Sequence, residues 1–447
     1  MLTLLYFILA ISLLVVIHEY GHFWVARRCG VRVLRFSVGF GKPLWSFRDR
    51  HGTEFAIAPI PLGGFVSMLD EREAPVPEHL QQQAFNRKSP WARIAIASAG
   101  PLANFIFAIL AYWALFVAGT SGLVPVVGQV KPDSVAQLAG IRSGDEIVAV
   151  QQHPTPTWEA VNWQLLNFIG EDADIQLTVT DADGLQRQVW LSVNSWLAGP
   201  EVPDPFAALG LEPRQLPIPA IIGEVMPGEA AERAGLQAGD RIVAVNNDPV
   251  IDWYDWVERI RPAAGEALAV ELERAGKTVT LVLTPGRRTD EQGNHSGFIG
   301  AQVAVPEYPA GWVRTSHSGV LEGLQRGWQK TVDLTVFTLD SLWKMLLGDV
   351  SVKNLSGPIT IAKVAGASAA GGLEAFVGFL ALLSVSLAVL NLLPVPVLDG
   401  GHILFCAAEI LRGKPLPERV QAVAVQVGMF LLLSLMLVAF YNDIGRL

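Results

Sequence analysis

The sequence predicts a polytopic α-helical membrane protein, with four transmembrane helices and a membrane re-entrant β-sheet, into which an α+β region is inserted. Hydrophobic residues make up 51% of the 447-residue chain and charged residues only 17%. This composition is too apolar for an ordinary soluble protein and too polar for a protein that lies wholly in the membrane, so we expect a sizeable aqueous part. Four long apolar stretches flank a central region of lower hydropathy. The net charge of −9 gives no support to nucleic-acid binding.

The first apolar stretch runs from Leu2 to about Ala26 and is long enough to cross a bilayer. No charged residue occurs from Leu2 to Ile17, and the pair Arg27-Arg28 ends the stretch. It resembles a signal peptide only superficially, because its N-terminus carries no positive charge and a cleaved segment would hardly carry a metal motif. We therefore expect it to be retained.

A metal-binding pattern lies inside this stretch, at His18-Glu-Tyr-Gly-His22. On a helix the two histidines lie four positions apart on one face, so both imidazoles can reach one ion. Glu19 points about 100° away from His18 and can face an attacking water without being a ligand. Zinc suits this spacing best, and a third protein ligand must come from elsewhere in the chain. The alternative is a polar patch tolerated near a helix end.

Arginines and lysines are concentrated in residues 27–92, which places this loop in the cytoplasm and the N-terminus outside. Within the loop, residues 36–66 consist of short apolar segments joined by Gly and Pro turns, a pattern typical of strands. These segments are rich in Trp, Phe and Ile, so we expect a small sheet that dips into the membrane beside the metal. A compact cytoplasmic hairpin domain is the alternative.

The second apolar stretch runs from Ile94 to about Ala118 and is interrupted by Ala99-Gly-Pro-Leu-Ala-Asn104. Gly100 and Pro101 can kink a membrane helix and allow a neighbouring helix to approach closely. Asn104 can form a hydrogen bond across helices, although packing is the preferred interpretation.

The central region contains a repeat, because residues 128–150 recur without gaps as residues 223–245. Each copy predicts a strand, a turn, a short helix, a Gly-Asp turn and a second strand, and therefore two similar domains in tandem. The segments Ala139-Gly-Ile-Arg-Ser-Gly-Asp145 and Ala234-Gly-Leu-Gln-Ala-Gly-Asp240 resemble the bacterial form of the PDZ domain. That resemblance implies binding of extended peptide ends at a sheet edge. A spacer role without peptide binding stays open.

Residues 320–348 predict an amphipathic helix that lies on the outer membrane surface or is clamped over the core. The third apolar stretch, from Ala375 to Leu398, closes with Asn391-Leu-Leu-Pro-Val-Pro-Val-Leu-Asp-Gly-Gly-His402. Its two prolines break the helix, and irregular backbone at membrane depth needs a protein-lined or wet site. Asp399 is the natural third zinc ligand, and a helix cap is the alternative. His402 competes as a ligand, but a supporting role is preferred.

Positive charges at Arg412, Lys414 and Arg419 place the next loop in the cytoplasm, and the fourth stretch, from Val420 to Tyr441, returns the C-terminus outside. Both metal-binding motifs then lie at one leaflet. We expect the following parts: membrane core with the metal motif and a β region at 30–68 (1–118), first PDZ domain (119–215), second PDZ domain (216–310), outer amphipathic helix and connector (311–372), and second membrane core (373–447).

Together, the His18 motif, Gly63-Gly-Phe-Val, Ala99 to Asn104, the tandem repeat and Asn391 to Gly401 resemble the site-2 protease family of intramembrane zinc metalloproteases. The resemblance covers nearly the whole chain. It implies one zinc ion on His18, His22 and Asp399, with Glu19 as the catalytic base. It also implies that Asn391 and the re-entrant sheet, including Gly63, Gly64 and Phe65, hold unwound substrate.

For bacterial members with a double PDZ insertion, the resemblance implies location in the inner membrane, with the PDZ pair and both termini in the periplasm. The implied substrates are single-span proteins already trimmed by another protease: an anti-sigma factor of an envelope stress response, and remnant signal peptides. We expect the PDZ pair to exclude bulky uncut substrates as a size filter. Two other functions are alternatives: a membrane adaptor with a structural metal, and a metal transporter, which the lack of repeated spans makes weak.

Overall fold

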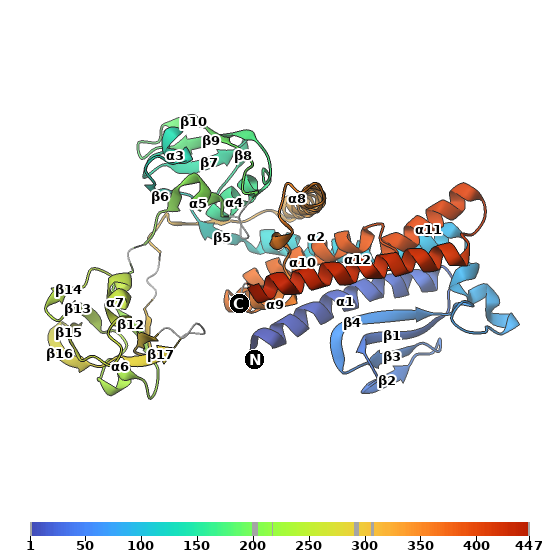
Figure 1. The fold of residues 1–447 in the computed structure, drawn as a ribbon, viewed down its shortest axis with the longest axis horizontal. Coiled ribbons are helices and arrows are strands. Elements are labelled where there is room, and N and C mark those ends of the chain that lie inside the picture. The colour runs from blue at the N-terminus through green and yellow to red at the C-terminus, as the bar shows by residue number, and fades with distance from the viewer. Residues whose placement is uncertain (1, 199–203, 217, 290–294, 305–307, 446–447) are drawn as a thin grey trace.

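The computed structural model describes residues 2–198, 204–216, 218–289, 295–304 and 308–445 (Figure 1). Within these ranges, four helices are long and apolar enough to cross a membrane. They are α1 (Leu2–Arg28), α2 (Pro90–Ala118), α10 (Leu373–Leu392) and α12 (Glu418–Gly445). The prediction of a polytopic membrane protein is confirmed, and each helix overlaps one of the apolar stretches.

Helix α2 is the centre of the membrane bundle and packs against α1, α8, α10 and α11. Small side chains bring its neighbours close, as is common where lipid provides no hydrophobic driving force between helices. A Cβ atom at Gly21 of α1 would lie 2.9 Å from the Ala103 Cβ of α2, and one at Gly327 of α8 would lie 2.8 Å from the Ile109 carbonyl oxygen. These glycines therefore set the distance between the helices.

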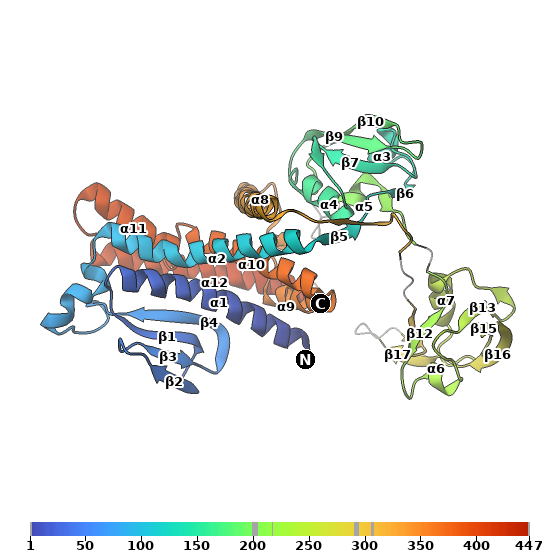
Figure 2. The same cartoon turned by 180° about the vertical axis from the view of Figure 1, so that it is seen from behind.

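A four-stranded sheet follows α1, with the order β2-β3-β1-β4. Its strands are β1 (Val33–Phe40), β2 (Trp45–Arg48), β3 (Glu54–Ile57) and β4 (Ile60–Met68). Strand β1 is parallel to β3 and antiparallel to β4, while β2 is antiparallel to β3. Edge strand β4 runs beside α1 (Figures 1 and 2). The 3₁₀ turns η1 (Glu78–Gln83) and η2 (Phe85–Arg87) lead into α2.

The third span breaks where its prolines predict. Helix α10 ends at Leu392, and α11 (Asp399–Arg412) begins after six residues of irregular chain. This segment satisfies part of its own backbone, because the Val397 and Leu398 N–H groups both donate to the Val395 carbonyl, at 2.8 and 3.0 Å. A Cβ atom at Gly401 would lie 2.6 Å from the Pro396 Cα. Glycine therefore lets the chain fold back onto the start of α11.

Two α+β modules occupy the central region, outside the bundle (Figures 1 and 2). The first contains β6 (Val127–Val130), α3 (Val135–Leu138), β7 (Glu146–Val150), β8 (His153–Pro154), α4 (Trp158–Leu166), β9 (Ala173–Thr180), β10 (Gln186–Val193), α5 (Pro205–Leu209) and β11 (Leu211–Pro213). The second contains β12 (Ile222–Val225), α6 (Ala230–Arg233), β13 (Arg241–Val245), β14 (Asp248–Pro249), α7 (Trp253–Ile260), β15 (Leu268–Arg274), β16 (Lys277–Leu283), β17 (Gly286–Thr289), β18 (His295–Phe298) and β19 (Ala301–Val303).

The modules share one topology, as the repeat predicts. Their main sheets have the equivalent orders β10-β9-β7-β8 and β16-β15-β13-β14. The aspartate of the Gly-Asp turn is buried in each repeat. Arg187 pairs with Asp145 in the first module, and Arg274 pairs with Asp240 at 2.6 Å in the second. The strand, short helix and strand expected for each copy are therefore present.

Strands β5 (Thr120–Leu123) and β20 (Val313–Ser316) pair as the chain leaves and re-enters the membrane part. Helix α8 (Val320–Leu347) confirms the expected helix and crosses α2 (Figure 1). The first module contacts α8 directly, because Lys344 Nζ lies 2.7 Å from Glu171 Oε1. After η3 (Val352–Asn354), helix α9 (Pro358–Ala370) follows, which the sequence pattern does not predict.

Candidate metal and catalytic site

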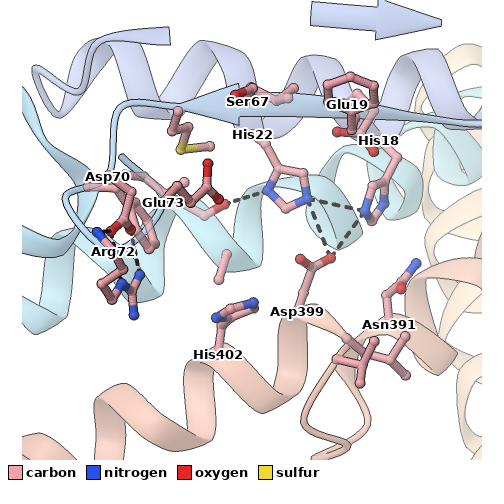
Figure 3. A pocket seen from close by; sticks show the side chains of 18 residues that line it. His18, Glu19, His22, Ser67, Asp70, Arg72, Glu73, Asn391, Asp399 and His402 are labelled. Carbon is pink, nitrogen blue, oxygen red and sulfur yellow. Dashed lines mark hydrogen bonds and ion pairs between the residues drawn. The ribbon is translucent and has the colours of Figure 1, made fainter. Parts of the chain in front are cut away.

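Three side chains from the two ends of the chain converge between α1 and α11 (Figure 3). The Asp399 Oδ2 atom lies 3.1 Å from His18 Nε2 and 3.4 Å from His22 Nε2. The two Nε2 atoms are 3.2 Å apart. Both histidines are buried, and Asp399 is the first residue of α11. The structure therefore brings together the three residues that the sequence proposes as ligands.

The donor set fits a cation. The His22 Nδ1 atom lies 2.8 Å from the Ile96 carbonyl oxygen, which can only accept, so Nδ1 carries the proton and Nε2 presents a lone pair. Among the described residues, the buried Asp399 Oδ2 atom has no hydrogen-bond partner. The lone pairs of His22 Nε2 and Asp399 Oδ2 face one another 3.4 Å apart, and a positive charge between them would remove their repulsion. Two imidazoles and one carboxylate are a ligand set that catalytic zinc uses.

Glycine lets α2 approach the histidines. A Cβ atom at Gly100 would lie 2.7 Å from His18 Nε2 and closer still to His22 Nε2. No side chain fits there without displacing a ring. The Gly100 position, which the sequence assigns to a kink or to close helix approach, thus lies directly against the proposed ligands.

A cavity of about 410 Å³ opens beside the three residues, and Glu19 lines it. The Glu19 side chain is half-buried and lines the cavity together with Val66 of β4. A Cβ atom at Gly64 would lie 3.4 Å from Glu19 Cγ and 2.8 Å from Val15 Cγ1. The absence of a side chain at Gly64 therefore lets the edge strand lie directly on the helix that carries the motif.

The residues that the resemblance assigns to substrate also lie at or near this cavity. Asn391, at the end of α10, lines it (Figure 3). Phe65, in β4, lines it as well. Gly63 lies two residues before Phe65 in β4, and a Cβ atom at Gly63 would meet the Phe40 ring. His402 lines the cavity but does not belong to the group of potential ligands found among the described residues.

The other end of the cavity is charged. Asp70, Arg72 and Glu73 line it (Figure 3). Arg72 donates to both oxygens of Asp70, at 2.9 and 2.6 Å, and this contact raises the pKa of the Arg72 guanidinium. The cavity is therefore lined by charged side chains in addition to Glu19 and the three proposed ligands.

Two contacts of the site do not follow from the sequence. The Ile96 carbonyl orients His22, and the Asn104 side chain lies 3.3 Å from His18 Nδ1. A backbone carbonyl leaves no signal in a sequence. Asn104 does leave one, because it is a polar side chain within an apolar stretch, but the pattern favours packing over a contact with a ligand.

Known proteins resemble this chain along nearly its whole length. The model of peptidase family M50 matches residues 6–435. The regulator of sigma E protease of Salmonella typhi is 46% identical, over 99% of this chain and 98% of the relative. The regulator of sigma-E protease RseP of Escherichia coli K12 is 45% identical with the same coverage. A Vibrio cholerae protein described as a zinc metalloprotease is 44% identical. The chain therefore belongs to peptidase family M50, and it is a membrane-embedded zinc metalloprotease of the site-2 type.

Proposed function

We propose that His18, His22 and Asp399 hold the zinc ion and that Glu19 is the general base of peptide-bond hydrolysis. The observation that carries this proposal is the convergence of the three side chains, with distances of 3.1 to 3.4 Å between their donor atoms. Glu19 borders the same cavity without belonging to the ligand group. A base beside the metal, rather than on it, suits that role.

When bound, zinc supplies Lewis-acid polarisation of the scissile carbonyl and lowers the pKa of water. Glu19 then takes the proton of the attacking water and passes it to the leaving nitrogen, so one carboxylate acts first as base and then as acid. Ile96 keeps the His22 ring in a fixed orientation through its carbonyl. The charged side chains of Asp70 and Arg72 line the same cavity, and they give the water that the reaction consumes a polar path to the site.

The substrate is held in an extended conformation, because the carbonyls of a helix are hydrogen-bonded and shielded. Strand β4 is the edge of its sheet and adjoins the cavity through Phe65 and Val66. An extended chain can add to such an edge through main-chain hydrogen bonds. We assign Gly63, Gly64 and Phe65 to this contact, and Asn391 to holding the substrate from the opposite side of the cavity.

The sheet is re-entrant in this proposal. Large apolar side chains are exposed in its outer strand β2, in the neighbouring strand β3 and just before β2: Trp45, Phe47, Ile57 and Leu44 are 57%, 48%, 49% and 73% exposed. An apolar surface of this kind suits contact with lipid better than contact with water. The positive residues of the 27–92 loop support a cytoplasmic position for it. The modules and both termini then lie in the periplasm and the spans in the bacterial inner membrane.

The substrates are transmembrane segments of single-span proteins that another protease has already trimmed. Two of the relatives are named as regulators of sigma E, which supports an anti-sigma factor as substrate in an envelope stress response. Remnant signal peptides are the second proposed class.

The two modules are tandem PDZ domains, with the boundaries given above, that act as a periplasmic size filter. Deletion of residues 125–310 tests the filter, because the β5–β20 pair holds the ends of the deletion together: Leu123 is the register partner of Val313. The variant is expected to cleave full-length substrate that the intact protein rejects. Unchanged discrimination between trimmed and full-length substrate would rule out the filter.

The central experiment measures zinc in the purified protein and cleavage of a trimmed single-span substrate in detergent. We expect wild type to contain one zinc ion and to cleave. Glu19→Gln should keep zinc and lose cleavage, whereas Asp399→Asn should lose zinc on dialysis. Full zinc occupancy in dialysed Asp399→Asn would show that a different residue completes the site.

A further inference from the structure

The two proposed histidine ligands are oriented in different ways. His22 Nδ1 faces a backbone carbonyl, which fixes its tautomer without help from any side chain. His18 Nδ1 faces the amide of Asn104 at 3.3 Å. An amide can donate or accept according to its orientation, so the tautomer of His18 depends on a side chain that can rotate.

We propose that Asn104 is a positioning residue that sets the tautomer of His18: its amide oxygen accepts the Nδ1 proton and leaves the Nε2 lone pair free for zinc. The inference rests on the proposed metal centre and extends it to a side chain that touches neither zinc nor substrate. Ligand histidines generally donate their second ring N–H to such a partner, which fixes the ring and strengthens the ligand.

The hydrogen bonds of Asn104 are consistent with two orientations of its side-chain amide. Asn104 is fully buried, with Nδ2 toward His18 and an Oδ1 atom that has no hydrogen-bond partner among the described residues. In this orientation Nδ2 donates to Nδ1, so the proton of His18 sits on Nε2, which lies 3.1 Å from Asp399 Oδ2 and 3.2 Å from His22 Nε2.

Zinc ligation reverses the arrangement, because Nε2 must then be free of its proton. The proton moves to Nδ1, and a half-turn of the amide brings Oδ1 to face it. The two ends of an amide have the same shape, so the half-turn needs no other movement. The orphaned oxygen is thereby satisfied, and the number of protons on the imidazole is unchanged.

Zinc affinity of the full-length protein, measured by chelator competition in detergent, tests the proposal. Asn104→Leu keeps the approximate volume of the side chain and removes the acceptor, so zinc binding should weaken by about 10–100-fold. Asn104→Asp supplies a carboxylate acceptor and should bind zinc close to the wild-type level. Ser384→Ala is the matched control: its buried hydroxyl donates to the Asn104 main-chain carbonyl at 2.9 Å rather than to His18, so zinc affinity should not change.

Nitrogen NMR of histidine-labelled wild type gives a second readout that does not depend on a variant folding. In the zinc-loaded protein, His18 should carry its proton on Nδ1; a proton on Nε2 would overturn the inference.

The zinc affinities of the variants can also overturn the inference. It fails if Asn104→Leu binds zinc like wild type, or if Asn104→Asp binds zinc as weakly as Asn104→Leu. His18→Ala separates the two levels: wild-type zinc affinity in that variant would refute the metal centre itself. Loss there, with unchanged affinity in Asn104→Leu, would refute only the role of Asn104.

Discussion

Replacement of Gly100 by alanine tests whether close helix approach is what keeps the ligands in position. The added Cβ would lie 2.7 Å from His18 Nε2 and closer to His22 Nε2, well inside ordinary contact distance. Overpacking of this kind typically costs about 1–3 kcal/mol. The nearest movable groups are the two rings, so we expect this strain to displace them. The loss should then appear as zinc affinity lowered by about 5–150-fold, since about 1.4 kcal/mol corresponds to a factor of ten.

Gly378→Ala in α10 is the matched control. A Cβ atom there would meet only Leu115 Cδ1, at 3.8 Å, which is ordinary van der Waals contact. Alanine favours a helix by about 1 kcal/mol over glycine, so this variant should keep zinc and unfold at the same or a higher temperature. Chelator competition and substrate cleavage, measured on both variants in one detergent, give the comparison. Wild-type zinc affinity and cleavage in Gly100→Ala would refute the packing argument.

Three further predictions concern the base, the first module and the second. Glu19→Gln should lower cleavage by about 10²–10⁴-fold at unchanged zinc content; cleavage at the wild-type rate would remove Glu19 from the mechanism. Lys344→Met should speed hydrogen exchange around Glu171, its partner at 2.7 Å, while exposed Lys277→Met should not. Burial alone would raise the pKa of Asp240, but Arg274 and a backbone N–H lower it overall. A lowered pKa stabilises the second module above the unfolded value of about 4, so Asp240→Asn should speed exchange there at pH 7, and the difference should vanish as the pH falls below 4.

Much of the fold could be predicted because its signals are local. An apolar stretch, a proline break or a repeated segment can each be recognised within one continuous piece of sequence. The structure has the helices, the helix break and the two modules that these signals predict. Helix α9 could not be predicted in this way, because the backbone N–H groups at its start donate to a side chain from another part of the sequence. Asp443, at the end of α12, accepts from the backbone N–H groups of Gly357 and Ile359 at 3.0 and 2.7 Å. A helix whose capping group lies more than eighty residues away has no cap in its own sequence.

The proposed ligands could be predicted for a different reason. Ionisable groups in apolar stretches are costly, so His18, His22 and Asp399 stand out by their position in the chain alone. Their closeness in the structure supports the proposal, made from their side-chain chemistry, that they bind one zinc ion. Their supporting contacts are harder to predict, because backbone carbonyls are the same at every residue, and an asparagine such as Asn104 costs less to bury than a charge.

The break in the third span explains how a carboxylate, the proposed ligand Asp399, can lie beside the two histidines within an apolar segment. Asp399 is the first residue of α11, where the helix dipole and free N–H groups favour a negative charge. A helix start can occur inside an apolar segment only if one helix ends there and another begins. Residues 393–398 make this break, and some of their backbone groups form hydrogen bonds with one another. Gly400 and Gly401 let the returning chain pack against them. The prolines therefore end one helix, the glycines allow the next helix to begin close by, and Asp399 at its first position faces the histidines of α1.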